Sequence, residues 1–246
     1  MAVPPQLHGL LLINKPAGLS SVDVLRQLKW VLGWNTKMGH AGTLDPFATG
    51  LLIVCLGRGT KLVPLLMDVS KGYGVVARFG QLTDTLDKTG RLLSEQLVPQ
   101  SFDELVKEAI KLLGGQYKQI PPVFSALKHE GAPLYHLARE QLLDEGALQD
   151  LAESKARWVI IYKLLIDSIE RPRLSFSCEV SKGAYIRSLA DDLAQKVGLR
   201  ATTEELCRTF IGPFLVGSAH ELESLKNRQC VEKALIDVEK ARALLA

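Results

Sequence analysis

The amino-acid sequence predicts an α+β fold with a mixed, largely antiparallel sheet flanked by helices and loops. Short apolar runs typical of buried strands alternate with amphipathic helical patterns along the 246 residues. Two strand patterns, at residues 158–169 and 174–180, are joined only through Arg171-Pro172-Arg173, as in neighbouring antiparallel strands. The composition, 47% hydrophobic and 23% charged, is that of a globular chain with a sizeable core.

The first part of the chain begins with a buried strand, predicted at residues 9–13. A helix is then expected to start at Ser20 or Ser21, with Asp23 in its first turn, and to end near Gly33. The next segments are a loop rich in Gly, Thr and Pro, a second buried strand and a short helix, predicted at residues 35–50, 51–56 and 61–67.

The rest of the chain adds elements around less regular segments. Ser101 and Glu104 form a capping-box pattern that opens a helix running to Leu113. Residues 144–154 are polar and carry no clear signal. The further predictions are a strand, a turn-rich connector, a helical segment, an amphipathic helix and a helical C-terminus, at residues 73–79, 83–90, 133–140, 186–197 and 227–246.

No internal repeat, low-complexity tract or clear linker divides the sequence. We therefore expect a single domain over residues 1–246, with the weakly patterned residues 116–155 as an insertion. The apolar run near the N-terminus lacks a basic segment before it and ends at Asn14-Lys15, too short for a signal peptide or a membrane span. We expect a cytoplasmic protein.

The cysteine pattern argues against a metal site. No two cysteines form a C-x-x-C pair, and no histidine lies at metal-ligand spacing from any of them. We expect buried, reduced thiols rather than zinc ligands or disulfides, at positions Cys55, Cys178, Cys207 and Cys230.

The net charge of +3 permits an RNA partner but does not require one. Common alternatives fail on spacing. The segment GRGTK at residues 57–61 lacks the glycine spacing of a phosphate loop, and Leu62 replaces the third glycine of a dinucleotide-binding motif. The sequence contains neither a serine-hydrolase elbow nor an H-E-x-x-H motif.

The most informative segment is GHAGTLDPFATG, residues 39–50. It places one carboxylate, Asp45, and one imidazole, His40, among glycines, alanines and threonines, directly before an apolar strand. Pro46 restricts Asp45 to an extended or turn conformation. A lone Asp-Pro is most often only a turn, so this pattern alone leaves both a catalytic and a structural interpretation open.

The segment GHAGTLDPFATGLLIVCLGRGTK resembles the signature of TruB-type tRNA pseudouridine-55 synthases. Further motifs follow in that family's order over nearly the whole chain: Asn14-Lys15-Pro16, Tyr73, Thr83-Asp84-Thr85, Gly90, IPPVFSALK at residues 120–128, KGAYIR at 182–187, Leu206-Cys207-Arg208-Thr209 and Gly212-Pro213-Phe214. The resemblance implies the pseudouridine-synthase catalytic fold and an RNA-modifying isomerase that needs no cofactor or metal.

The resemblance also implies catalytic residues. Asp45 matches the family's catalytic aspartate, Tyr73 the tyrosine that stacks on the target uracil, and Arg187 the arginine that pairs with the catalytic carboxylate. Such an arginine would keep Asp45 ionised and oriented. Without the motif, Tyr73 would be a core tyrosine and Arg187 a solvated charge. Whether Asp45 attacks the sugar or the uracil stays open.

Four further positions match substrate-binding residues of the family. His40 matches a loop histidine that takes part in uridine flipping, Tyr185 the tyrosine of the Y-I-R pair, and Leu206 an apolar pocket wall. Lys15, with Pro16, matches a loop near the active site.

The sequence departs from the family pattern at Gly72, where a charged residue is usual before the tyrosine; this could loosen the strand that carries Tyr73. Many relatives continue into a C-terminal PUA domain, which we do not expect here. The expected partner is the T arm of tRNA, contacted by residues 116–155, and the expected state a monomer. The alternatives are a non-catalytic RNA-binding protein or tRNA-folding chaperone, and an isomerase with another RNA target.

Overall fold

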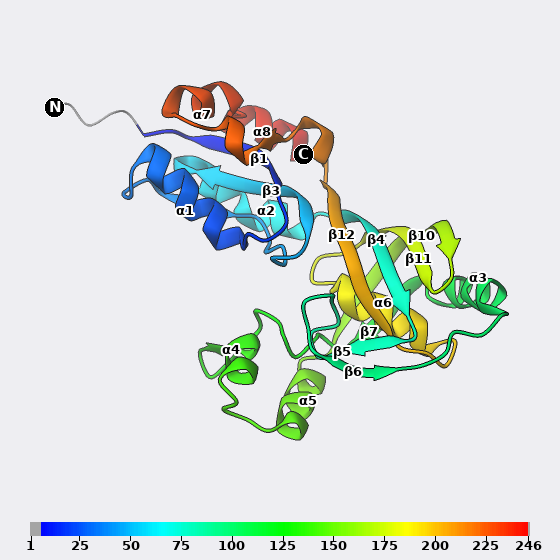
Figure 1. Cartoon of the computed structure of the whole chain (residues 1–246). Helices are drawn as coiled ribbons and strands as arrows, with labels where there is room; N and C mark the ends of the chain where they lie inside the picture. The colour runs from blue at the N-terminus through cyan, green and yellow to red at the C-terminus, as the bar shows by residue number, and fades with distance from the viewer. Residues whose placement is uncertain (1–5, 246) are drawn as a thin grey trace. The chain divides into compact units, whose positions relative to one another are not determined.

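The computed structural model describes residues 6–245 and resolves two compact units. One, the terminal unit, contains the chain up to Gly74 and again from Leu206 onward; the other, the middle unit, is Val75–Glu205. Residues 1–5, the start of the N-terminal segment discussed above, and residue 246 lie outside the described part. Figure 1 labels the elements.

The terminal unit is built on the strand order β14-β1-β3-β12, with β2 paired to β3 and β13 to β12. Its elements are β1 (Gly9–Lys15), α1 (Ser21–Leu32), β2 (Met38–His40), β3 (Thr49–Leu56), η1 (Gly57–Leu62), α2 (Val63–Asp68), the start of β4 (Lys71–Phe79), the end of β12 (Ala201–Ile211), β13 (Phe214–Leu215), η2 (Val216–Ser218), β14 (His220–Glu221), η3 (Leu222–Ser224), α7 (Arg228–Ala234) and α8 (Val238–Leu245).

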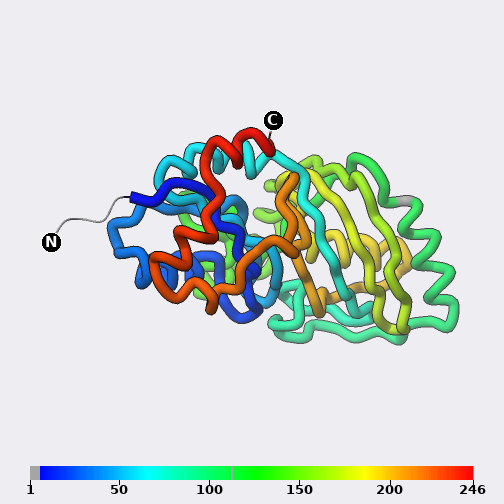
Figure 2. The backbone as a smooth tube through the Cα atoms, turned by 90° about the horizontal axis from the view of Figure 1, so that it is seen from above, coloured from blue at the N-terminus to red at the C-terminus, as the bar shows by residue number. Residues whose placement is uncertain are grey.

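Strands β1 and β3 form the centre of this unit because both of their faces are apolar. Leu10 and Ile53 pack on one face with residues of α2 and α8, whereas Leu11 and Val54 pack on the other with residues of α1 and α7. Alternation along a strand sends successive side chains to opposite faces, so a continuous apolar run buries both. In Figure 2 the N-terminal strand, in blue, and the C-terminal helices, in red, lie side by side.

The middle unit carries the strand order β12-β4-β11-β10-β7 and two small two-stranded sheets. The long strands β10 and β11 pair antiparallel, as do β10 and β7. Besides parts of β4 and β12, its elements are β5 (Gln81–Thr83), β6 (Leu92–Glu95), α3 (Phe102–Leu112), β7 (Gly115–Gln119), β8 (Lys128–His129), β9 (Ala132–Pro133), α4 (Leu134–Arg139), α5 (Glu145–Ser154), β10 (Arg157–Glu170), β11 (Arg173–Val180) and α6 (Ile186–Gln195).

The predicted fold class is confirmed: helices flank a mixed, largely antiparallel sheet. Strand β1 pairs antiparallel with β3, β2 with β3, β12 with β13, and β10 with both β7 and β11, whereas β1–β14 and β12–β3 are parallel pairs. The helix predicted from Ser20 is also confirmed. The Ser20 side chain accepts from the backbone N–H of Asp23, and the Asp23 carboxylate accepts from the N–H of Ser20. This is a complete capping box.

One expectation is wrong, and two elements have no counterpart among the predictions. The capping box at Ser101 does not form, because the Ser101 backbone (ψ 16°) is not extended and its side chain makes no cap hydrogen bond. The segment without a signal is helix α5, whose N-cap Asp144 accepts from the N–H of Ala147 at 2.8 Å. Strand β12 was not predicted at all.

Candidate active site

Asp45 lies in the loop between β2 and β3, and its side chain is partly exposed. The Asp45 carbonyl accepts from the N–H of Ala48 at 3.1 Å, which closes a tight turn around Pro46. On the other side of Asp45, the N–H of Leu44 donates to the Ser21 hydroxyl at 2.9 Å. A backbone hydrogen bond on one side and a side-chain hydroxyl on the other therefore fix the backbone around Asp45, whose side chain stays partly exposed.

Lys15 lies beneath this loop and is fully buried. Its ammonium group donates to the carbonyls of Pro16, Leu19 and Pro46, at 2.8, 2.7 and 3.3 Å. Burial lowers the pKa of Lys15 to about 8, and the negative charge of Asp45 acts in the opposite direction. Through its bond to the Pro46 carbonyl, Lys15 contacts the backbone of the loop that carries Asp45; its role in substrate binding stays a prediction.

Arg208 is a second buried cation beside the loop, and the sequence analysis gave it no role. Its guanidinium donates to the carbonyls of Leu51 at 2.7 Å, Thr43 at 3.3 Å and Gly42 at 3.1 Å. These carbonyls come from both ends of the segment that contains Asp45. A planar group with donors in several directions can satisfy all three, so Arg208 closes the loop.

The sheet register explains why the two cations lie on either side of the loop. In β3, Gly50 pairs with Lys15 of β1 and with Arg208 of β12. Gly50 has φ +100°, and a Cβ there would lie 2.4 Å from the Arg208 carbonyl oxygen. Only glycine permits this approach. The last glycine of the GHAGTLDPFATG motif is therefore required where the Asp45 loop enters the sheet.

His40 ends β2 and is partly buried. Its pKa is lowered, first by burial and then by the positive charge of Arg208, while the Gly42 backbone acts in the opposite direction. Leu206 is buried in β12, and its carbonyl accepts from the Thr49 hydroxyl at 3.5 Å. Both predicted substrate-binding residues thus belong to the terminal unit, with Asp45 and Lys15.

Tyr73 is buried on β4 in the same unit, with only 7% of its surface exposed. The glycine before it, Gly72, is packed tightly rather than loosely. A Cβ at this position would lie 2.0 Å from a ring carbon of Phe210 on β12. The Phe210 ring occupies the space that a side chain at position 72 would need, so the departure from the family pattern coincides with an aromatic neighbour.

Arg187 belongs to the middle unit and is buried, not the solvated charge that its helical position alone would suggest. Its guanidinium donates to the carbonyls of Thr85 at 2.6 Å and Phe124 at 3.0 Å, and lies 3.8 Å from the Asp87 carboxylate. The motifs Thr83-Asp84-Thr85 and IPPVFSALK therefore meet at the arginine of the third motif, KGAYIR.

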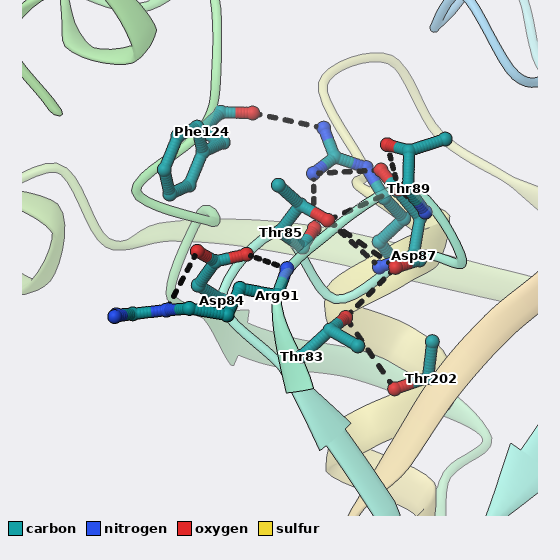
Figure 3. Close-up of polar contacts among 9 residues, drawn as sticks. Thr83, Asp84, Thr85, Asp87, Thr89, Arg91, Phe124 and Thr202 are labelled. Carbon is teal, nitrogen blue, oxygen red and sulfur yellow. Dashed lines mark hydrogen bonds and ion pairs between the residues drawn. The ribbon is translucent and has the colours of Figure 1, made fainter. Parts of the chain in front are cut away.

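Asp87 is itself held in a polar turn, shown in Figure 3. Its carboxylate accepts from the Thr89 N–H at 2.9 Å and from the Thr85 hydroxyl at 3.0 Å. Gly90 closes the turn by donating its N–H to the Asp87 carbonyl at 3.1 Å. Glycine is required there, because a Cβ would lie 2.3 Å from the Thr85 hydroxyl oxygen. Thr85 and Gly90 of this turn match family motifs, but the sequence assigns no role to Asp87; the aspartate and its neighbouring threonines are the signal that marks the turn as a support for a buried cation.

Tyr185 immediately precedes α6 as its N-cap, and the guanidinium of Arg157 lies 4.9 Å from the centre of its ring. The predicted site residues thus divide between the units. Asp45, His40, Lys15, Tyr73 and Leu206 belong to the terminal unit, and Tyr185 and Arg187 to the middle unit. The pairing of Arg187 with Asp45 stays a prediction.

The described residues also bear on metals, thiols and membranes. Among residues 6–245, no group of three or more His, Cys, Asp or Glu side chains could hold a metal ion. The cysteines are free thiols, and burial raises the pKa of both Cys55 and Cys178 to about 12. No helix in the same range is both long and apolar enough to span a membrane.

Comparison with known proteins agrees with these motifs. The family model described as TruB family pseudouridylate synthase (N terminal domain) matches residues 29–186. The tRNA pseudouridine synthase B of Pseudomonas aeruginosa is 40% identical over 220 residues, which cover 89% of this chain and 69% of that protein. The enzyme of the same name from Clostridium acetobutylicum is 40% identical over 234 residues, covering 95% and 77%.

Solved structures share the fold. The crystal structure of a Cbf5-Nop10-Gar1 complex contains a chain with TM-score 0.70 and 26% identity, covering 95% of this chain and 61% of that one. An H/ACA RNP bound to a substrate RNA containing 2'-deoxyuridine gives TM-score 0.68 at 24% identity. This chain therefore spans about three fifths of the solved chains' length. With the family model matching more than half of its residues, the chain belongs to the TruB family of pseudouridylate synthases.

Proposed function

We propose that this chain is a tRNA pseudouridine synthase that converts a uridine in the T loop of tRNA into pseudouridine. The observation that carries the proposal is the Asp45 loop, which holds an accessible carboxylate between the two buried cations Lys15 and Arg208. A turn with a merely structural aspartate does not need such support. The relatives named tRNA pseudouridine synthase B supply the substrate class.

In the proposed reaction the bond between ribose C1′ and uracil N1 breaks, the base turns, and C1′ joins C5; C5 then loses its proton and N1 gains one, so that the product is an isomer of uridine. Asp45 serves as the nucleophile that retains one fragment on the enzyme during the rotation. Attack on the sugar and attack on the ring both fit this role. Arg187 orients the carboxylate, and Tyr73 covers the free base and can accept a proton.

We further propose how the RNA is held. The target uridine must leave its stack to reach Asp45, with His40, Tyr185 and Leu206 around the flipped base. Residues 116–155 contact the T arm; Lys128, Arg139 and Lys155 in this segment supply positive charge. We assign this activity to a monomer in the cytoplasm, and size-exclusion chromatography with and without tRNA would test the monomer.

The replacement Asp45→Asn tests the proposal most directly. The amide keeps the shape of the side chain but is not a nucleophile, so turnover should be abolished while tRNA affinity stays within a few-fold of the wild type. Tritium release from C5-labelled uridine in tRNA measures turnover, and filter binding measures affinity.

The matched control is Asp167→Asn, which changes an exposed aspartate on β10 and should leave both quantities unchanged. Substantial tritium release by the Asp45→Asn protein would refute the assignment of the nucleophile. If the wild-type protein binds tRNA but releases no tritium, the result would favour the alternative of a non-catalytic RNA-binding protein or tRNA-folding chaperone.

A further inference from the structure

Gln119 makes an unusual pair of contacts with the backbone of Tyr185. Gln119 is the last residue of β7 and is 1% exposed. Its side-chain oxygen accepts from the Tyr185 N–H at 2.7 Å, and its side-chain nitrogen donates to the Tyr185 carbonyl at 3.0 Å. A buried side-chain amide thus satisfies both backbone groups of one residue, which only a group with a donor and an acceptor can do.

This contact matters because Tyr185 starts helix α6. Tyr185 is the N-cap of the helix, and no side chain caps the helix there. Ser188 lies about one helical turn after Tyr185, and its hydroxyl donates to the Ile120 carbonyl at 2.9 Å. Arg187 lies between these two anchors. The position of its backbone is therefore set from β7 and the residue that follows it.

Two further polar groups, the Tyr117 hydroxyl and the Asp192 carboxylate, orient the side-chain amide of Gln119. Its nitrogen also donates to the Tyr117 hydroxyl, and that hydroxyl lies 3.4 Å from the Asp192 carboxylate. Asp192 is two turns along α6 from Tyr185. The relay Asp192–Tyr117–Gln119 therefore links two points of the helix to one strand and fixes which way the Gln119 amide faces.

The ring of Tyr185 is held from the adjacent strand. Arg157 of β10 pairs in register with Gln119, and its guanidinium lies 4.9 Å from the centre of the Tyr185 ring. Neighbouring positions on two strands thus hold the backbone and the ring of the same residue.

We propose that Gln119 is a positioning residue of the enzyme, which fixes the Tyr185 backbone and, through it, the first turn of α6 that carries Arg187. The inference rests on the proposed function, in which Tyr185 and Arg187 serve the reaction. Gln119 itself touches no reacting atom. Its loss should therefore reduce the rate of the bound complex more than the affinity for tRNA.

The isosteric change Gln119→Glu tests this role through pH. An ionised glutamate can still accept from the Tyr185 N–H, but it faces the Tyr185 carbonyl without a donor. A protonated glutamate regains one donor. The titratable and charged groups around this position, which must be counted in its pH response, are Tyr117, Cys178, Asp191, Asp192, Arg157, Arg187, Lys196 and Arg200.

Burial and the carboxylate of Asp192 disfavour the ionised form of the new side chain, whereas Arg157, which pairs in register with position 119, favours it. The pKa of Asp192 is itself raised to about 7, by burial first and by Asp191 second. Both carboxyl groups therefore become neutral as the pH falls, so the relay should be restored on the acid side. The wild-type protein must be measured over the same range to separate the two effects.

The experiment compares kcat and KM on a tRNA transcript between about pH 6 and pH 8 for the wild type, Gln119→Glu and Gln96→Glu. Gln96 is an exposed glutamine directly after β6, outside the segment proposed to contact the T arm, so its variant is the matched control. At about pH 8, kcat of Gln119→Glu should fall about 100-fold, with KM within about threefold of the wild type. Relative to the wild type, it should recover about tenfold by pH 6, while Gln96→Glu follows the wild type.

A Gln119→Glu enzyme that follows the wild type at every pH would overturn the inference. If that variant does not fold, Tyr117→Phe decides, since it removes only the hydroxyl that orients the amide. A folded Tyr117→Phe protein with wild-type kcat would overturn the inference, and a several-fold lower kcat at unchanged KM would support it. A wild-type protein that forms no pseudouridine in tRNA would instead refute the proposed function.

Discussion

At the scale of single residues, the site depends on cations that are buried rather than exposed. Lys15 and Arg208 are almost completely inaccessible, yet their donors are used on backbone carbonyls. A buried charge is tolerated when hydrogen bonds replace its water. Three of these carbonyls, those of Gly42, Thr43 and Pro46, belong to the loop carrying Asp45. The buried cations and the loop therefore depend on each other: the loop carbonyls solvate the charges, and the charges hold the loop backbone. Replacing either cation should disturb the loop.

The replacement Arg208→Lys should lower kcat by about 10- to 100-fold while changing KM only a few-fold, because one ammonium cannot reach carbonyls that lie in three directions. Steady-state kinetics on a tRNA transcript measures both constants. Arg173→Lys is the control, since Arg173 forms an exposed ion pair with Glu204 and its change should have little effect. A folded Arg208→Lys enzyme with normal kcat would show that the loop keeps its shape without the guanidinium.

Asp192 gives the protein a pH-dependent stability. Its pKa is raised from 3.8 to about 7 in the folded state, so between these values the folded protein holds more protons than the unfolded one. The free energy of unfolding therefore falls as the pH rises through this window. Asp192→Asn removes the titration and should raise the free energy of unfolding by roughly 1–2 kcal/mol at about pH 8, a value reduced because the side chain is only partly buried.

Urea denaturation at about pH 3 and about pH 8 measures this difference. The variant and the wild type should be nearly equal at the lower pH, which lies below both pKa values, so that Asp192 is mostly protonated in both states. An equal gain at both pH values would mean that the change acts through packing and not through charge.

At the scale of elements, strand β4 shows how neighbouring strands share one space. Gly72 of β4 packs against the ring of Phe210 of β12, and a Cβ at position 72 would lie only 2.0 Å from a ring carbon. The replacement Gly72→Glu should therefore destabilise the protein by about 2–3 kcal/mol, because the ring or the strand must move. The double variant Gly72→Glu/Phe210→Ala should regain most of that loss, which thermal denaturation of the four proteins in the cycle would show.

Additive effects of the two changes would contradict this packing. The expected single effect of Phe210→Ala alone is a smaller loss, since its ring is only partly buried.

The predictability of the elements follows from where their signals lie. Regular apolar patterns were sufficient for β1, β3, β10, β11 and α6. Helix α5 was missed because its polar surface leaves only the Asp144 cap as a local sign. Strand β12 was missed because two glutamates interrupt its pattern and because its pairing with β3 comes from a distant part of the chain.

The same reason limits what could be known of the site. The Asp45 loop can be recognised from the sequence because its glycines, its histidine and its aspartate stand in one continuous segment. The role of Arg208 cannot be recognised in this way, because its carbonyl partner Leu51 is 157 residues away. Likewise, Gln119 looks like any strand residue until Tyr185, 66 residues later, is placed beside it.

At the scale of the whole molecule, the modest net charge of +3 limits how strongly the protein can hold RNA through phosphates. The logarithm of the tRNA affinity should fall with the logarithm of salt concentration, by about 0.7 to 0.9 per phosphate neutralised. We expect the slope of log affinity against log salt concentration to be about −2 to −4, which corresponds to a small number of phosphate contacts. Filter binding across a salt series measures it, and a steep slope near −10 would point to a concentrated basic surface that net charge conceals.

The path of the chain has a consequence for how the protein is made. The terminal unit is interrupted at Gly74 and resumes at Leu206. The Asp45 loop leaves the ribosome early, but the guanidinium that ties its two ends is synthesised only 157 residues after its partner Leu51. Contacts so distant in sequence form late, because a long loop must close first. A nascent chain can therefore fold its middle unit while the Asp45 loop is not yet held in place, and chemical competence should come only after β12 has been synthesised and has paired with β3.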